Sequence, residues 1–206
     1  MHSMSESAPN ARERRRANAV AEATAFAQAR TIEHGLASFT IEDICEAAGF
    51  SRRTFFNYFA SKEDAVLGIL QTRDRDDDIE AAFIASRGDL IDDLVTLSVA
   101  RWTRQAVPLA DAATVGAAIK SEPKILTRML SHIHDSEQGA TALIEQREGY
   151  EAGDPRAVTA ALIFGTFMRM TFDEGITAGQ HASFEDILRA RVQLARALFT
   201  STESPS

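Results

Sequence analysis

The sequence contains a single cysteine, Cys45, among its 206 residues, so no disulfide can form within one chain. One cysteine is typical of proteins of the reducing cytosol. Prolines (5) and glycines (11) are scarce as well, and no long stretch alternates apolar and polar residues as a half-exposed β-strand does. Together with the abundance of alanine, a strong helix former, these absences predict an all-α protein.

Long hydrophobic runs are also missing. The most apolar stretch, residues 157–168, is bounded by Arg156 and Arg169, whereas a helix that spans a membrane needs about 20 apolar residues. Residues 1–10 lack the apolar segment of a signal peptide. We therefore expect a cytoplasmic protein that has no membrane partner.

The net charge of −8 argues at first against nucleic acid as a partner, but the charge is unevenly distributed. Residues 1–62 contain eight Lys/Arg and seven Asp/Glu, a net charge of +1, whereas residues 63–206 contain fourteen and twenty-three, a net charge of −9. A nearly neutral domain with focused basic patches can bind DNA even when the rest of the chain is acidic. Seven of these eight basic residues lie near the two ends of the first part: Arg12, Arg14, Arg15, Arg16, Arg52, Arg53 and Lys62.

Apolar residues at helical spacing, separated by glycine, proline and capping residues, predict nine helices. Thr40-x-x-Asp43 has the spacing of a capping box, and Ser61-x-x-Asp64 is similar. The acidic run 74–78 is interpreted as a solvated helix face rather than as a metal site. The predicted helices cover residues 10–33, 40–48, 51–58, 61–70, 89–107, 111–120, 123–148, 155–174 and 183–200, each approximately.

The second and third of these helices are joined by a tight turn at Gly49, which is the helix-turn-helix arrangement. In proteins of this kind the second helix of the pair lies in the major groove of DNA. An arginine in its first turn can donate two hydrogen bonds to guanine or bind a phosphate. Phe55 and Phe59, one turn apart, are interpreted as core residues. The polar residues that this helix offers are Ser51, Arg52, Arg53, Thr54, Asn57 and Tyr58, followed by Lys62.

The run TIEDICEAAGFSRRTFFNYFASKEDAVL, from Thr40 to Leu67, resembles the tetracycline-repressor (TetR) family of bacterial regulators. The family motif has a threonine, two apolar residues, Ala-Gly-[Val/Phe]-Ser, a variable pair, an aromatic segment that ends in phenylalanine, and Lys-Glu. The close match covers about residues 36–67. One departure is Phe56, which stands where many members have a tyrosine that donates to a phosphate.

The resemblance implies roles for individual residues in binding DNA. Thr40 would cap its helix and contact a phosphate, and the arginines near the N-terminus would form an arm that reaches the minor groove, unless they are simply the solvated start of a helix. Ser51, Arg52, Arg53 and Thr54 would lie against the bases, and Asn57, Tyr58 and Lys62 would bind the backbone.

The resemblance further implies two domains: a three-helix DNA-binding domain over residues 10–62 and a helical ligand-binding and dimerisation domain over 63–201. A two-fold dimer reads a palindromic operator, and repression released by a small effector is the usual mode of the family. The seam expected between the two copies is formed by Leu188, Val192, Ala195 and Phe199. An apolar or amphipathic effector would be contacted by large apolar side chains, although each of them could equally be a core residue. The candidates are Trp102, Met129, Ile133, Phe164, Met168 and Phe172.

Two other functions compete with this interpretation. A helical-bundle enzyme would need a signature such as a glycine-rich phosphate loop, Gly-x-Ser-x-Gly, His-Glu-x-x-His or paired Glu-x-x-His motifs, and none of them occurs. A helical protein-interaction module would account for the helices and the acidity, but not for paired arginines beside a glycine turn. We therefore predict a DNA-binding regulator that is not an enzyme and uses no cofactor.

Overall fold

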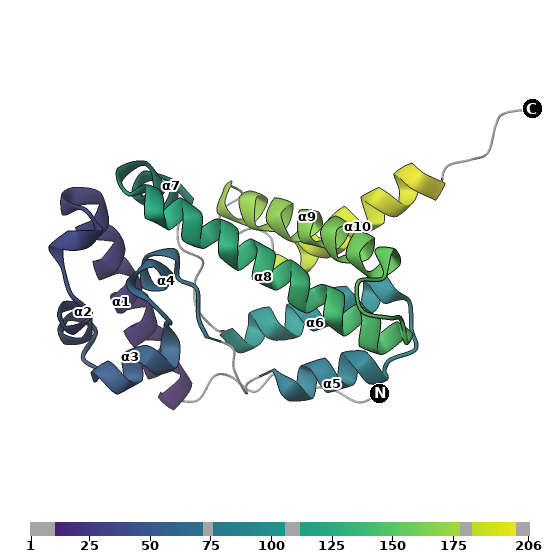
Figure 1. Cartoon of the computed structure of the whole chain (residues 1–206), viewed down its shortest axis with the longest axis horizontal. Coiled ribbons are helices and arrows are strands. Elements are labelled where there is room, and N and C mark those ends of the chain that lie inside the picture. The colour runs from purple at the N-terminus through teal and green to yellow at the C-terminus, as the bar shows by residue number, and fades with distance from the viewer. Residues whose placement is uncertain (1–10, 72–75, 106–111, 178–182, 201–206) are drawn as a thin grey trace, which may run out of the picture. The chain divides into compact units, whose positions relative to one another are not determined.

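The computed structural model describes residues 11–71, 76–105, 112–177 and 183–200, and within these ranges all regular structure is helical (Figure 1). The all-α prediction is thus confirmed. The elements are α1 (Ala11–His34), a 3₁₀ turn η1 (Leu36–Ser38), α2 (Ile41–Ala48), α3 (Arg52–Tyr58), α4 (Lys62–Leu67), α5 (Asp77–Ala85), α6 (Leu90–Gln105), α7 (Ala112–Ser121), α8 (Pro123–Glu148), α9 (Pro155–Thr177) and α10 (Phe184–Thr200).

Helix α5 has no counterpart among the nine predicted helices. Asp77 and Asp78 lie in its first turn, where carboxylates interact favourably with the helix dipole. The interpretation of the acidic run as a solvated face is wrong for Asp76, which is buried and lies 3.5 Å from the guanidinium of Arg101. Residues 74 and 75 of the run lie outside the described residues.

Helix α4 is shorter than predicted, because it ends at Leu67 rather than near residue 70. Gly68 follows in the left-handed conformation (φ 69°, ψ 20°), and its N–H donates to the carbonyls of Ala65 and Asp64. This is a glycine C-cap, a conformation that other residues adopt only at a cost. The predicted extension ran through this stop signal.

The chain divides into two compact units. Unit 1 comprises residues 1–71 and 105–128, and unit 2 comprises residues 72–104 and 129–206. The described helices of the second segment, α7 and the start of α8, therefore pack with the N-terminal helices. Units of packing and units of function need not coincide, so the predicted boundary between residues 62 and 63 stays a prediction.

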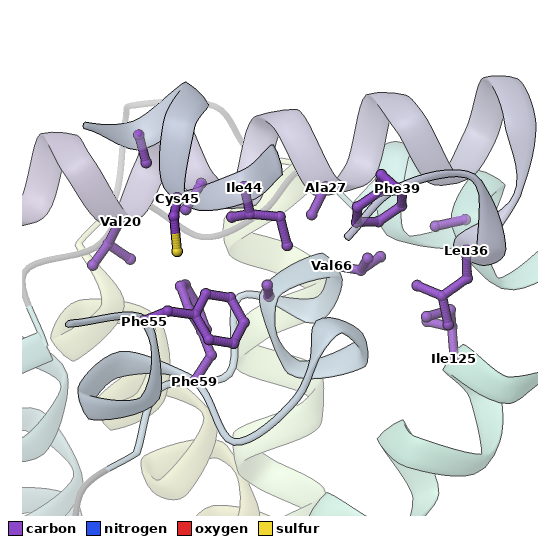
Figure 2. Packing of buried hydrophobic residues seen from close by; sticks show 14 residues of the cluster. Val20, Ala27, Leu36, Phe39, Ile44, Cys45, Phe55, Phe59, Val66 and Ile125 are labelled. Atoms are coloured by element: carbon purple, nitrogen blue, oxygen red, sulfur yellow. The ribbon is translucent and has the colours of Figure 1, made fainter. Parts of the chain in front are cut away.

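Unit 1 has one apolar core, which lies between α1 and α2 on one side and α3 and α4 on the other (Figure 2). Phe55 and Phe59 of α3 are fully buried in it, and Ile125 from the start of α8 belongs to the same cluster. Cys45 is buried there too, and burial raises the pKa of its thiol. A thiol in such surroundings reacts slowly.

Unit 2 has its own core, built from α5, α6, α8, α9 and α10. Leu188 and Val192 of α10 are buried in it, and so are Ala157 and Ala161 of α9. At the end of α8 the buried guanidinium of Arg147 pairs with Asp93 and Glu148 and donates to the carbonyl of Gly88.

Across the described parts of the chain, no helix is both long enough and apolar enough to cross a membrane.

Candidate nucleic-acid interface

Three residues set the bounds of α2 and the start of α3. Thr40 caps α2 through a capping box, in which its hydroxyl accepts from the N–H of Asp43 (3.2 Å) and the carboxylate of Asp43 accepts from the N–H of Thr40 (2.7 Å). Gly49 ends α2 at φ 66°, and the hydroxyl of Ser51 accepts from the N–H of Thr54 (3.2 Å) to start α3. The prediction that Thr40 caps this helix is confirmed.

The pKa of the capping carboxylate of Asp43 is shifted by its hydrogen bonds at this helix start. The backbone N–H of Thr40, followed by its hydroxyl, lowers the pKa of Asp43. Both bonds favour the ionised form, so Asp43 stays charged while it holds the first turn of α2.

One side of α3 is fixed to the core by its phenylalanines. The rings of Phe55 and Phe59 lie 5.4 Å apart, and neither side chain is exposed. Because α3 has only seven residues, it is too short to be stable alone. These two buried rings therefore hold the helix and turn its opposite side outwards, as predicted.

The outward side of α3 is polar and basic. Ser51, Arg52, Arg53 and Asn57 are exposed, and Thr54 and Tyr58 are half-buried. Phe56 is also on this side, with 41% of its surface exposed. The structure therefore presents every α3 residue that the sequence assigns to DNA.

The two arginines of α3 have different surroundings. The Nη1 group of Arg52 donates to Oε1 of Glu42 on α2, whereas no hydrogen bond or ion pair to the described residues engages Arg53. The pKa of Glu42 is lowered chiefly by its own backbone N–H, and Arg52 adds to the effect. Glu42 is a member of this surface that sequence reasoning did not single out.

The far end of α3 is packed by aromatic contacts. The ring of Tyr58 meets that of Phe50 edge to face at 5.8 Å, and the guanidinium of Arg16 lies over it at 5.4 Å. Arg16 belongs to α1, which begins at Ala11. The described residues of the predicted arm are therefore helical, which favours the interpretation as a helix start; the side chain of Arg12 lies outside the described residues.

Lys62 has partners within the protein. Its Nζ donates to the carbonyls of Leu36 (2.8 Å) and Phe39 (2.7 Å) and lies 4.8 Å from the centre of the Phe39 ring. An ammonium has three donors, so one hydrogen remains for a phosphate. Lys62 thus ties the start of α4 to the segment between α1 and α2, whatever it does with DNA.

Comparison with protein families assigns this part of the chain. Residues 26–67 match the model of the family described as bacterial regulatory proteins, tetR family. The N-terminal domain is that of a TetR-family regulator. A search among curated proteins found no match. The TetR family consists of DNA-binding transcriptional regulators, whose members are generally not enzymes.

The predicted effector contacts fall into three groups. Phe164 is buried in the core of unit 2 and Met168 packs against it. Trp102 and Phe172 lie together, with ring centres 5.8 Å apart. Met129 and Ile133 are half-buried on α8.

The second group has a member that the sequence did not reveal. Phe184, at the start of α10, stacks on Trp102 with ring centres 4.8 Å apart and an angle of 19° between the planes, and it also contacts Phe172 at 5.5 Å. Three rings from α6, α9 and α10 thus form one aromatic cluster. Only its aromatic character could have suggested Phe184, because its neighbours come from distant parts of the chain.

The last two helices expose apolar side chains, of which only Phe199 belongs to the predicted seam. Leu188 and Val192 of the expected seam are buried in the protomer's own core, which corrects the prediction for these two residues. The exposed apolar residues of α9 and α10, which pack side by side (Figure 1), are Val158, Leu162, Ile163, Met170, Leu194, Leu198 and Phe199.

Proposed function

We propose that this protein is a homodimeric repressor that binds a palindromic operator through α3 and is released by a small apolar or amphipathic effector. One observation carries the DNA-binding part of this proposal. Helix α3 exposes Arg52, Arg53 and Asn57 while Phe55 and Phe59 fix its other side in the core. A recognition helix needs this combination, because base contacts require a backbone that does not shift on binding.

The other residues of this surface complete the DNA site. Ser51, Arg52, Arg53 and Thr54, at the start of α3, contact base edges, and Thr40, Asn57, Tyr58 and Lys62 bind phosphates. In support, all of them lie in unit 1, and the remaining donor of Lys62 and the exposed amide of Asn57 are available to phosphate oxygens.

The apolar surface of α9 and α10 supports the homodimer. Leu194 and Leu198 are 58% and 69% exposed and lie one turn apart on α10, and Leu162 on α9 is 47% exposed. Large apolar side chains exposed on neighbouring helices in this way mark an interface. In a two-fold dimer the same surface meets its own copy, which gives two recognition helices and a palindromic site.

The effector part of the proposal is supported by the aromatic cluster of Trp102, Phe172 and Phe184 in unit 2. Trp102 and Phe172 are proposed effector contacts, together with Met129, Ile133, Phe164 and Met168. An effector lowers the affinity for DNA only if it prefers a conformation that binds DNA less well. Apolar compounds that stabilise the protein against heat should therefore also weaken DNA binding.

DNA binding is tested with the full chain and duplexes from upstream of its own and neighbouring genes, at a stated salt concentration. We expect specific binding, and a loss of about 1–3 kcal/mol when a base-reading arginine is removed, as in Arg52→Ala or Arg53→Ala. Arg156→Ala is the control, because it removes an exposed arginine of unit 2 that pairs with Asp154. Equal affinity for random DNA, unaffected by the α3 variants, would contradict the proposal.

A further inference from the structure

Arg52 is held from two sides while it stays accessible. Its Nη1 group donates to Glu42 on α2, and its guanidinium carbon lies 5.6 Å from the centre of the Phe56 ring, one turn further along α3. The side chains of Arg52 and Glu42 are nevertheless 62% and 58% exposed. The guanidinium is therefore oriented but not covered.

Phe56 has the support that a positioning surface needs. Its ring meets Phe55 edge to face, at 5.3 Å and 89°, and Phe55 is fully buried. Its carbonyl accepts from Nε2 of Gln71 at 3.0 Å. A continuous set of contacts thus runs from the core of unit 1 through Phe55 and Phe56 to the guanidinium of Arg52.

A guanidinium has five N–H donors in a fixed planar arrangement. The bond to Glu42 uses one hydrogen of Nη1, which leaves Nε, Nη2 and the second hydrogen of Nη1. Two of these suffice for the paired acceptors of guanine, O6 and N7. The carboxylate of Glu42 also repels phosphates, so it disfavours the use of Arg52 as a simple backbone contact.

We propose that, of the two arginines assigned to base edges above, only Arg52 reads guanine, that Glu42 and Phe56 are positioning residues for it, and that Arg53 binds the backbone instead. This inference rests on the proposed function. Its physical basis is the cost of ordering a long side chain on binding, which amounts to about two- to tenfold in affinity. The side chain of Arg52 is already partly ordered by its contacts with Glu42 and Phe56 before DNA binds. Arg53 has no such partners among the described residues.

The test begins with selection of the preferred duplex from a randomised DNA library by the full-length protein. Affinities for that duplex and its single-base variants are then measured for the wild type and for single substitutions. Arg52→Lys keeps the charge but removes the planar donors, so we expect it to abolish the preference for guanine at one position of each half-site. Glu42→Gln and Phe56→Leu should each reduce the same preference about two- to tenfold.

Two further variants separate positioning from structure and charge. Phe56→Tyr keeps the ring and should retain the guanine preference that Phe56→Leu loses. Arg53→Gln should weaken binding evenly across sequences and reduce the salt dependence by about one phosphate contact. The thermal unfolding midpoint of each variant should match the wild type, because the replaced side chains are exposed.

Three results would overturn the inference. Glu42→Gln could raise the affinity evenly for all duplexes and leave the guanine preference intact, in which case Glu42 is only a repulsive charge. Phe56→Leu could retain the full preference, in which case the ring positions nothing. Arg53→Gln could be the variant that loses the guanine preference. If the wild type selects no sequence at all, the proposed function itself fails, and that outcome is distinct from these three.

Discussion

Units 1 and 2 differ in what their exposed helices present to a partner. Helix α3 of unit 1 presents arginines and an asparagine above a phenylalanine core, whereas α9 and α10 of unit 2 present leucines and a phenylalanine above a core of their own. A charged polymer is recognised by polar groups in fixed positions, and a second copy of a protein is recognised by apolar area. The contrast supports the two partners that we propose, DNA for unit 1 and a second copy of the chain for unit 2.

The units also differ in how they accommodate charge. In unit 1 the carboxylate of Asp64 on α4 is 1% exposed and pairs with Arg128 of α8, whose Nη2 donates to Oδ2 at 3.1 Å. In unit 2 the exposed carboxylate of Asp78 accepts two hydrogen bonds from Arg104, at 2.6 and 2.8 Å. Buried and exposed pairs contribute to stability in different ways, so the two units should respond differently to the loss of a partner.

The largest effect is expected where the apolar surface of unit 2 is given a charge. Leu198→Glu should weaken dimerisation by about 3–6 kcal/mol, since burial of one leucine contributes about 1.5–3 kcal/mol and a two-fold interface contains two copies. Sedimentation equilibrium over a range of concentrations measures the change. Val192→Ala is the control, because Val192 is buried in the protomer's core; it should lower the stability of the fold rather than the association. An unchanged dissociation constant for Leu198→Glu would show that this surface does not form the dimer interface.

A smaller loss is expected inside unit 1. Arg128→Met keeps most of the length of the side chain but leaves the buried carboxylate of Asp64 without its guanidinium partner. We expect the free energy of unfolding to fall by about 3 kcal/mol, the lower end of the range for a broken buried pair, because Arg128 remains 30% exposed. Urea denaturation measures the loss.

The matched control for this prediction is Arg169→Met in unit 2. Arg169 lies 3.3 Å from Glu137 and is 47% exposed, so its loss should cost less than about 1 kcal/mol. If both variants lose the same stability, the pairing of the buried Asp64 carboxylate with Arg128 contributes no more to stability than an exposed ion pair does. A second variant, Asp64→Asn with Arg128→Met, should recover part of the loss because it removes the charge that lacks a partner.

The parts of the fold that could be predicted from sequence depend on short-range signals. Thr40, Gly49 and Ser51 act within a few residues of themselves, so the bounds of α2 and α3 followed from them. Gly68 is an equally local signal for the end of α4, but the apolar residues that follow it suggested that the helix continues. Helix α5 was not predicted, because its apolar residues are few and follow an acidic run, although that run favours the start of a helix.

The parts of the site that could not be predicted depend on how helices pack. The α3 residues of the candidate DNA surface follow from their spacing on one helix. The contact between Glu42 and Arg52 depends on the angle between α2 and α3, and the carbonyl partners of Lys62 depend on the path of the chain after α1. Apolar residues occur on two sides of α10, so its sequence does not show whether Val192 or Leu198 faces the protomer's own core.

The smallest effect is expected for the exposed pair of unit 2, and it depends on pH. Hydrogen bonds from Arg104 lower the pKa of Asp78 to about 2, from 3.8. A carboxyl whose pKa is depressed by folding stabilises the folded state above its unfolded pKa, and the contribution disappears as the pH falls through the folded value. Asp78→Asn should therefore lower the thermal midpoint above about pH 4, and the difference from the wild type should vanish as the pH approaches 2. Asp77→Asn, in the same turn of α5, controls for the loss of a charge near the helix start. Equal profiles for the two variants would mean that the helix dipole, rather than Arg104, accounts for the effect.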